Sequence, residues 1–271
     1  MKNLFYRLLI YLDTAGESDT YYNIALYIVN HIECIARMRI NELAGACYVS
    51  PATISRFCKA LGYENFAHLK QECYTFQDVD YDTTNFINIP MDVMYARPKD
   101  AAGDYINRVC DSLHAMNDAM DWPAVDTLLH AIHQSDRVAF FGLQFSQSAA
   151  VYFQTDLLLS GKYTLAYLDS ERQIECAKSL DENSLAIIMT VNGNIRKGGS
   201  KLLRYVRRSN AKIAVISCLD KNAFDFPIDY MVSLGHPGDP KVGKHNLLTL
   251  VELMSFRYYT LFAAAEGRVI R

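Results

Sequence analysis

Five short apolar runs, separated by stretches with helical spacing, constrain the fold of this chain more than any other feature. The runs cover residues 138–141, 164–168, 185–190, 213–217 and 230–234, and helical patterns such as residues 201–206 lie between them. Strands that alternate with helices form a parallel sheet with helices on both faces. The second half of the chain is therefore predicted to be a three-layer α/β domain with a parallel sheet.

Amphipathic helices flank this predicted sheet. Before the first run, apolar residues recur at helical spacing from Ile106 to Met120. A second helix follows, with Asp121 as its N-cap and Pro123 in its first turn. A last helix is expected from about residue 246 to 264.

The first 75 residues show helical spacing without strand-like alternation, so they are predicted to form an all-α unit. From residue 78 to 100 no period is sustained, and Pro90 and Pro98 are expected to break any helix. The fold class is thus α+β multidomain. We expect an all-α helix-turn-helix domain over residues 1–77, a linker over residues 78–100, and the α/β domain over residues 101–271.

Composition excludes several classes of protein. With 271 residues, 51% of them hydrophobic, the chain is neither collagen-like nor disordered nor a disulfide scaffold. The seven cysteines are scattered and include no Cys-x-x-Cys pair, so reduced thiols in a cytoplasmic protein are expected. Arg7 interrupts the apolar start, which favours a helix over a signal peptide. No apolar run is long enough to cross a membrane, and no metal site or cofactor is predicted.

Residues 40–62 have the layout of two helices joined by a tight turn. The first helix ends near Cys47, and the turn passes through Tyr48 and Val49. Ser50 is the expected N-cap of the second helix, with Pro51 at its first position. The apolar residues of the second helix share one face, which is expected to be buried: Ile54, Phe57, Cys58 and Leu61.

The opposite face of the second helix is polar, as in a helix that enters a DNA major groove. Arg56 is suited to pair with a guanine, whereas Lys59 and Lys70 are better placed for phosphates. The whole chain has a net charge of −3, but residues 50–70 hold three basic residues against Glu64 alone. A helical interaction or dimerisation domain is the alternative that spacing leaves open. The predicted DNA-contacting residues are Ser50, Ala52, Thr53, Ser55, Arg56, Lys59, Tyr63, Asn65 and Lys70.

Two turns of the predicted sheet are rich in hydroxyl and amide groups. The first runs from Gly142 to Ser148, and the second runs from Thr190 to Asn194. Backbone amides at helix starts bind anions, and neighbouring strand ends form the crevice where open α/β sheets bind ligands. The two turns are therefore candidates for one small-molecule site.

The residues of the helix-turn-helix resemble a known family. The runs 42–44, 49–50 and 53–63, continuing to Phe66 and to residues 69–70, are similar to the winged helix-turn-helix of RpiR-type bacterial transcriptional regulators. The segment Ser-Arg-Phe-Cys-Lys-Ala-Leu-Gly over residues 55–62 is the most specific part. The resemblance implies a transcriptional regulator that binds a double-stranded DNA operator.

The two turns, with the helix over residues 122–133, resemble the sugar isomerase (SIS) domain, which is the usual partner of the RpiR-type domain. SIS domains generally bind phosphosugars through hydroxyls of these turns, and in regulators they sense metabolites without turning them over. Gly142, Ser146 and Ala150 match the first turn, and Ser217 matches a later strand end. The resemblance implies effector-binding roles for Gly142, Gln144, Ser146, Ser148, Thr190, Asn192, Gly193, Asn194 and Ser217.

The sequence departs from the SIS pattern at three positions. Gln144 stands where a second glycine is usual, and Asn192 and Ile195 each replace a hydroxyl residue. Asn192 still offers an amide donor, but Ile195 has no side-chain donor. Three interpretations stay open: a phosphosugar site, a site for a different small ligand, and a pocket that serves only structure or dimerisation.

A sugar-phosphate isomerase with a helical assembly domain is the alternative function. It would need a general base beside the sugar, for which Glu171, Glu175 and His245 are the candidates. The fused DNA-binding domain favours a sensor that is not an enzyme. A homodimer or homotetramer is predicted, because two recognition helices supply affinity that one modest patch lacks.

Overall fold

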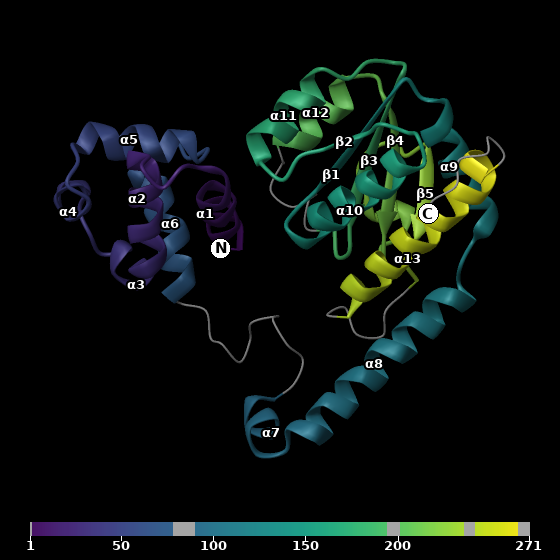
Figure 1. The fold of residues 1–271 in the computed structure, drawn as a ribbon, viewed down its shortest axis with the longest axis horizontal. Coiled ribbons are helices and arrows are strands. Elements are labelled where there is room, and N and C mark those ends of the chain that lie inside the picture. Colours follow the sequence, from purple (N-terminus) through teal and green to yellow (C-terminus); the bar gives the residue numbers. More distant parts are fainter. Residues whose placement is uncertain (1, 78–89, 194–200, 236–241, 265–271) are drawn as a thin grey trace. The chain divides into compact units, whose positions relative to one another are not determined.

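The structure is a computed structural model that describes residues 2–77, 90–193, 201–235 and 242–264. The chain divides into an N-terminal helical unit and a C-terminal α/β unit. Figure 1 shows the helices and strands of each unit, which are described separately below. No helix in the described ranges is both long and apolar enough to cross a membrane.

Six helices make up the described part of the N-terminal unit. They are α1 (Lys2–Thr14), α2 (Thr20–Asn30), α3 (Ile32–Ile35), α4 (Ile40–Ala46), α5 (Pro51–Ala60) and α6 (Phe66–Gln77). Their shared core is built around Phe57, whose ring meets the edges of the Tyr11 and Tyr21 rings at centroid distances of 6.1 and 5.6 Å. The predicted all-α character is confirmed.

The resemblance also implied a β wing after the second helix of the motif. Over residues 2–77 the structure contains no strand, so no wing forms in this part of the chain. The reason is the short connection after α5: α6 begins at Phe66, and only residues 61–65 lie between the two helices.

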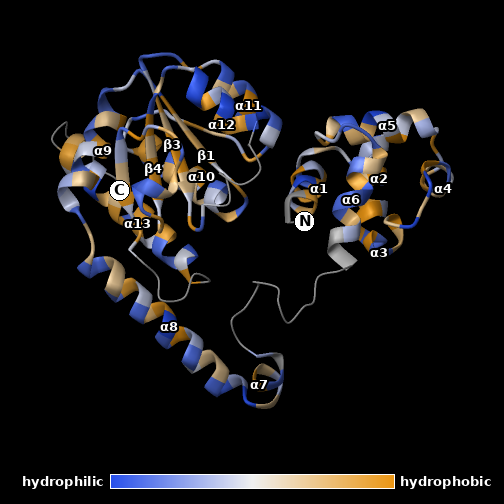
Figure 2. Ribbon diagram, turned by 180° about the vertical axis from the view of Figure 1, so that it is seen from behind, coloured by the Kyte–Doolittle hydropathy of each residue, from blue (hydrophilic) through white to orange (hydrophobic). Residues whose placement is uncertain are grey.

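The C-terminal unit contains the predicted parallel sheet. Its strands are β1 (Arg137–Gly142), β2 (Leu165–Ala166), β3 (Ser184–Thr190), β4 (Lys212–Ser217) and β5 (Tyr230–Ser233), in the order β2-β1-β3-β4-β5. Every neighbouring pair is parallel, and all seven residues of the central strand β3 are buried. Figure 2 shows these strands mostly in the hydrophobic colours. All five apolar runs of the sequence thus contain strands.

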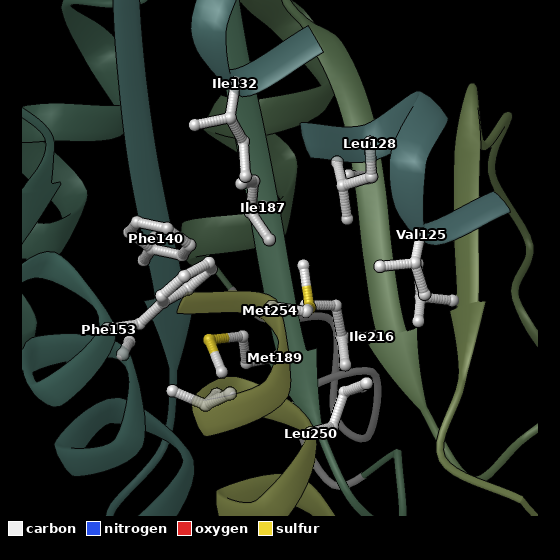
Figure 3. Close-up of a cluster of buried hydrophobic side chains, with 14 of the residues drawn as sticks. Val125, Leu128, Ile132, Phe140, Phe153, Ile187, Met189, Ile216, Leu250 and Met254 are labelled. Atoms are coloured by element: carbon white, nitrogen blue, oxygen red, sulfur yellow. The ribbon is translucent and has the colours of Figure 1, made fainter. Parts of the chain in front are cut away.

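Helices cover both faces of the sheet, as predicted. One face packs against α9 (Trp122–Gln134), α10 (Phe145–Leu159) and α13 (Gly243–Tyr258), and the other against α11 (Ser170–Lys178) and α12 (Lys201–Arg208). Figure 3 shows the first core, in which Phe140, Ile187 and Ile216 of the sheet meet side chains of the covering helices such as Phe153 and Met254. The predicted last helix is confirmed, and it continues as one π-helical turn over Tyr259–Ala263.

Part of the predicted irregular linker is helical. All of α7 (Met91–Ala96) and the first three residues of α8 (Pro98–Asp118) lie in the predicted linker, where no regular structure was expected. The rest of α8 confirms the helix that was expected from Ile106 to Met120. Pro98 does not break α8, because it occupies the first turn, where a missing backbone N–H costs nothing. The rest of the predicted linker, residues 78–89, lies outside the described ranges, and the domain boundaries stay a prediction.

The long helix α8 is tied to the last helix by buried polar contacts. Asn246, which is fully buried, accepts a hydrogen bond from the Ser112 hydroxyl at 3.0 Å and donates to the Ser112 and Leu234 carbonyls. Nearer the start of α8, the Tyr105 hydroxyl lies 2.9 Å from Nε2 of His245. These contacts fix the middle of α8 to the beginning of α13.

Small turns complete the C-terminal unit. A short 3-10 helix, η2 (Lys221–Ala223), follows β4, and the aromatic residues after it pack on the core beneath α11 and α12. All seven cysteines of the chain are free thiols. Burial raises the pKa of Cys58 and of Cys218 to about 12, so these two thiols are protonated and unreactive at neutral pH.

Candidate functional site

The first candidate site is the pair α4 and α5 with the turn between them. The turn takes residues 47–50, and α5 starts where the Ser50 hydroxyl accepts a hydrogen bond from the backbone N–H of Thr53 at 3.1 Å. Pro51 occupies the first turn of α5. The predicted N-cap and helix start are therefore confirmed, and they fix the direction in which α5 leaves the turn.

The two faces of α5 differ as the sequence indicated. Ile54, Phe57 and Cys58 are fully buried, and Leu61 is nearly so. On the other face Ala52, Arg56 and Lys59 are exposed, and Thr53 and Ser55 are partly exposed. An apolar underside thus holds the helix in place while its polar side stays accessible.

A row of polar contacts runs along the accessible side of α5. The Ser50 and Thr53 hydroxyl oxygens lie 2.9 Å apart, and Nη2 of Arg56 lies 3.4 Å from the Thr53 hydroxyl oxygen. The three residues are spaced by three, so they occupy successive turns of one helix face. The Thr53 hydroxyl therefore helps to orient the Arg56 guanidinium without burying it.

Tyr63 does not have the predicted accessibility. It is only 4% exposed, its hydroxyl is buried, and the guanidinium of Arg7 lies 5.1 Å above its ring. Burial raises the pKa of this phenol well above its usual range. The cause is Gly62, whose φ of +80° reverses the chain after α5 and turns Tyr63 inward. Burial of the hydroxyl argues against the predicted contact of Tyr63 with DNA.

The two remaining predicted residues lie on either side of the start of α6. Asn65 is exposed, and its side-chain oxygen accepts a hydrogen bond from the backbone N–H of His68, so it caps α6. Lys70 is half-buried, with its ammonium group 5.8 Å from the centre of the Phe66 ring. Both residues have structural roles in addition to the proposed contact with DNA.

The second candidate site lies at the carboxyl edge of the sheet. Gly142 pairs with Met189 in the register of β1 and β3, so the two predicted turns do leave neighbouring strands at the same edge. A Cβ on Gly142 would come within 3.0 Å of the Gln147 backbone nitrogen and 3.1 Å of the Met189 carbonyl oxygen. Glycine is therefore required where β1 passes into α10.

Gln144 adopts a backbone conformation that glycine prefers. Its φ of +52° and ψ of −119° place it at the start of α10 in a region that a side chain disfavours. This is the position where the SIS pattern has glycine, so the chain keeps the glycine backbone while adding an amide side chain.

Hydroxyl groups of the first turn differ in accessibility. Ser146 is buried, whereas Ser148 is exposed, and the Ser148 hydroxyl makes only a long contact of 3.4 Å with the Gln144 carbonyl. The backbone N–H groups of Ser146, Gln147 and Ser148 donate to carbonyls of the turn itself. A ligand here would consequently depend on side chains more than on backbone amides.

The second turn and the end of β4 are held together. Thr190 is buried and pairs with Ser217 in the strand register, while Asn192 is exposed. The Ser217 hydroxyl accepts a hydrogen bond from the Leu219 N–H, and Ser217 is fully buried. Ser217 thus has a structural role, and its burial argues against the predicted effector contact. Gly193 has a φ of +66°, and Asn194 lies outside the described residues.

A cavity beside this edge of the sheet was not predicted from the sequence. It has a volume of about 500 Å³ and is lined by Cys218, Leu219, Asp220, Asn222 and Ala223, which form the turn after β4. The backbone N–H of Cys218 donates to the carbonyl of Val191, so the cavity adjoins the second turn. Only the strand end at Ser217, followed by the polar residues Asp220 and Asn222, signals it in the sequence.

The candidate bases for isomerase chemistry do not form a cluster in this structure. Glu175 pairs with Lys178 at 2.6 Å on the exposed side of α11. His245 faces Tyr105 from α13, on the opposite face of the sheet. Glu171 lies in the first turn of α11. Among the described residues there is also no group of acidic, histidine or cysteine side chains arranged to hold a metal ion.

Comparisons with known proteins agree with the two-part architecture. Two curated relatives are uncharacterized HTH-type transcriptional regulators. One, from the aarA 3′ region of Providencia stuartii, is 24% identical, and the alignment covers 63% of this chain and 60% of the relative. The other, from Caldanaerobacter subterraneus, is 25% identical, and the alignment covers 63% of this chain and 59% of the relative. The alignments span about three fifths of the length of these relatives.

A solved structure shows a similar fold over nearly the whole chain. The Vibrio vulnificus NanR protein complexed with ManNAc-6P aligns with a TM-score of 0.53 at 15% identity, and the alignment covers 98% of this chain and 95% of that one. The helix-turn-helix domain of the rpiR family matches residues 12–74. This match contains the whole of α4, the turn and α5, so the N-terminal unit is similar to the helix-turn-helix domain of the rpiR family.

Proposed function

We propose that this chain is a transcriptional regulator that binds operator DNA through α5 and senses a small metabolite through its α/β unit. The observation that carries the proposal is the accessible side of α5 in an rpiR-family domain. Arg56 and Lys59 stand there on a helix whose opposite side is anchored in a core. A rigidly held helix with small residues at its start fits the major groove.

Selection of bound DNA tests this function directly. Purified protein is mixed with sheared genomic DNA, and bound fragments are sequenced for the wild type, for Arg56→Ala and for Arg204→Ala, which changes an exposed arginine on α12. We expect enriched sites with two related half-sites for the wild type and Arg204→Ala, and loss of enrichment for Arg56→Ala. Equal enrichment by all three proteins would rule out α5 as the reading element.

The proposed metabolite is a phosphosugar or a related anion. Support comes from the two turns that leave β1 and β3 side by side, with Ser148 and Asn192 exposed and Gln144 held in a conformation that costs energy. The solved structure of the similarly folded NanR protein is a complex with ManNAc-6P. We expect such a ligand to be bound and released unchanged, because the curated relatives are named as transcriptional regulators.

Thermal stability reports this ligand binding. A ligand that binds the native state raises the apparent melting temperature, so phosphosugars, the same sugars without phosphate, and inorganic phosphate are compared. A rise with phosphosugars alone, abolished by Ser148→Ala together with Asn192→Ala, supports the proposed site. Conversion of any of these sugars, followed by proton NMR, would instead favour the isomerase.

We also propose that the regulator is a homodimer through α10 and α13. Phe145, Tyr152 and Leu159 are exposed at seven-residue intervals on α10, so they form one stripe. Leu248 and Phe256 form a second stripe on α13, which packs beside α10. The charge of Asp156 and, from α13, that of Glu252 raise the pKa of Tyr152, so carboxylates lie beside the apolar side chains. An exposed surface with two neighbouring apolar stripes and acidic groups beside them fits a second copy of the chain.

A further inference from the structure

Tyr48, which closes helix α4, has a backbone conformation that residues with a side chain rarely adopt. The N–H of Val49 donates to the Ala44 carbonyl at 2.9 Å, and the N–H of Tyr48 donates to the Gly45 carbonyl at 3.2 Å. This pair of bonds is the Schellman arrangement that closes many helices. It requires the residue in the position of Tyr48 to be left-handed, and Tyr48 has a φ of +55°.

Other helices of this protein end in the same way with glycine. After α5, Gly62 has a φ of +80°, and the N–H of Tyr63 donates to the Cys58 carbonyl. After α10, Gly161 has a φ of +88°, and the N–H of Lys162 donates to the Leu157 carbonyl. Glycine adopts this conformation without a steric penalty, whereas tyrosine does not. Tyr48 is thus a costly residue at a position where glycine suffices.

Packing does not account for this tyrosine. Its side chain is 97% exposed, more than any other large hydrophobic residue in the described part of the chain. The neighbouring Val49 makes the contact with the core that accompanies such a helix end. An exposed ring at a strained position stabilises nothing within its own unit. Residues held in disfavoured conformations cluster at functional sites, so a role in binding is the consistent explanation.

The position of Tyr48 identifies the partner. Tyr48 lies in the turn two residues before Ser50, the N-cap of α5. In helix-turn-helix domains the second helix enters the major groove while the first helix crosses the DNA backbone. Tyrosine hydroxyls are among the groups that donate hydrogen bonds to phosphate oxygens. Because Tyr48 lies just after the first helix, α4, it presents a neutral donor next to the element expected to cross the backbone.

We propose that Tyr48 is a DNA-backbone contact, whose hydroxyl donates a hydrogen bond to a phosphate beside the groove that α5 enters. The inference rests on the proposed function of α5. It replaces the contact assigned to Tyr63 in the sequence, since that hydroxyl is buried. It also explains why a side chain is kept where the backbone favours glycine.

Three variants of the full-length protein test the proposal. Tyr48→Gly removes the side chain and suits the backbone, Tyr48→Phe removes only the hydroxyl, and Tyr95→Ala changes a tyrosine of similar exposure on α7. The probe is a short fluorescent duplex of random sequence at low salt, because a phosphate contact acts on every sequence. Melting temperatures are measured in parallel.

Both Tyr48 variants are expected to bind the duplex roughly tenfold more weakly than the wild type, as befits the loss of a hydrogen bond to a charged group. Tyr48→Gly should melt no lower than the wild type, and Tyr95→Ala should bind as the wild type does. The slope of affinity against salt should not change, because tyrosine is neutral. Unchanged binding by Tyr48→Gly, or wild-type affinity of Tyr48→Phe, would overturn the proposal while leaving the function of α5 intact. Failure of the wild-type protein to bind any duplex would overturn both.

Discussion

Arg56 and Lys59 lie one turn apart on the accessible side of α5, yet they are expected to contribute differently to DNA binding. Replacing Arg56 by Ala should cost about 1–3 kcal/mol on the selected operator and relax its specificity, because guanidinium groups recognise guanine edges. Replacing Lys59 by Ala should weaken binding to all sequences alike and reduce the salt slope by about one. Fluorescence anisotropy on operator and random duplexes separates the two. Identical losses on both duplexes for the two variants would show that Arg56 only holds phosphate.

At this scale the sequence predicts burial well and accessibility after turns poorly. The inward positions of Ile54, Phe57 and Cys58 follow from helical periodicity, and all three are buried. Tyr63 lies beyond Gly62, where a single left-handed residue redirects the chain, and periodicity does not extend across such a reversal. The hydroxyl of Ser217 is likewise used by the backbone of its own turn, which a sequence pattern does not reveal.

Among the secondary-structure elements, α5 depends on its N-cap. Replacing Ser50 by Ala removes the hydroxyl that accepts from the Thr53 N–H, which should lower the free energy of unfolding of the N-terminal unit by about 1 kcal/mol. Ser55→Ala is the matched control, because a serine within the helix has no such role and alanine is the better helix former. Urea unfolding followed by circular dichroism measures both. A Ser55 variant as destabilised as the Ser50 variant would contradict the capping role.

The contact between α8 and α13 is expected to make stability depend on pH. Burial, and secondarily the charge of Lys244, lowers the pKa of His245 in the folded protein. Its neutral form is therefore favoured by folding, and the unfolded chain gains protons first as the pH falls below about 6.5. Stability should consequently decline from that pH towards the lowered pKa.

Melting curves of the wild type and of His245→Gln over this range provide the measurement. The melting temperature of the wild type should fall further on acidification than that of the variant, because only His245 differs between the two proteins. Parallel pH profiles would exclude His245 as the source of the effect.

The elements themselves were largely predictable, with one exception. Short apolar runs bounded by turn residues predict strands, and each of these runs contains a strand of the observed sheet. Helix α7 and the start of α8 were missed because Pro90 and Pro98 were interpreted as breakers, although Pro90 directly precedes α7 and Pro98 lies in the first turn of α8, where proline favours a helix. The cavity after β4 has only a weak signal in the sequence, because its shape depends on how that turn packs beside the turn after β3.

For the whole molecule, the apolar surface over α10 and α13 leads to a prediction about assembly. Phe256 is 72% exposed, so Phe256→Glu should leave the fold intact while placing a charge in the proposed interface. Light scattering after gel filtration should show a dimer for the wild type and a monomer for the variant. Arg204→Glu, a charge reversal on α12 across the sheet, should stay dimeric. A dimer that persists in Phe256→Glu would move the interface elsewhere.

Helix α8 acts on the scale of the whole chain because of its length. Its 21 residues form one continuous rod of about 32 Å, which is attached to α13 through Ser112 and Asn246 in its second half. The contact of Tyr105 with His245 attaches the same rod to α13 a second time, nearer its start. A tilt of α13 by about 10° would be carried to α8 through these contacts, and would displace the start of α8 at Pro98, about 21 Å from Ser112, by about 4 Å. A small movement of the last helix would thus become a larger movement at the start of α8.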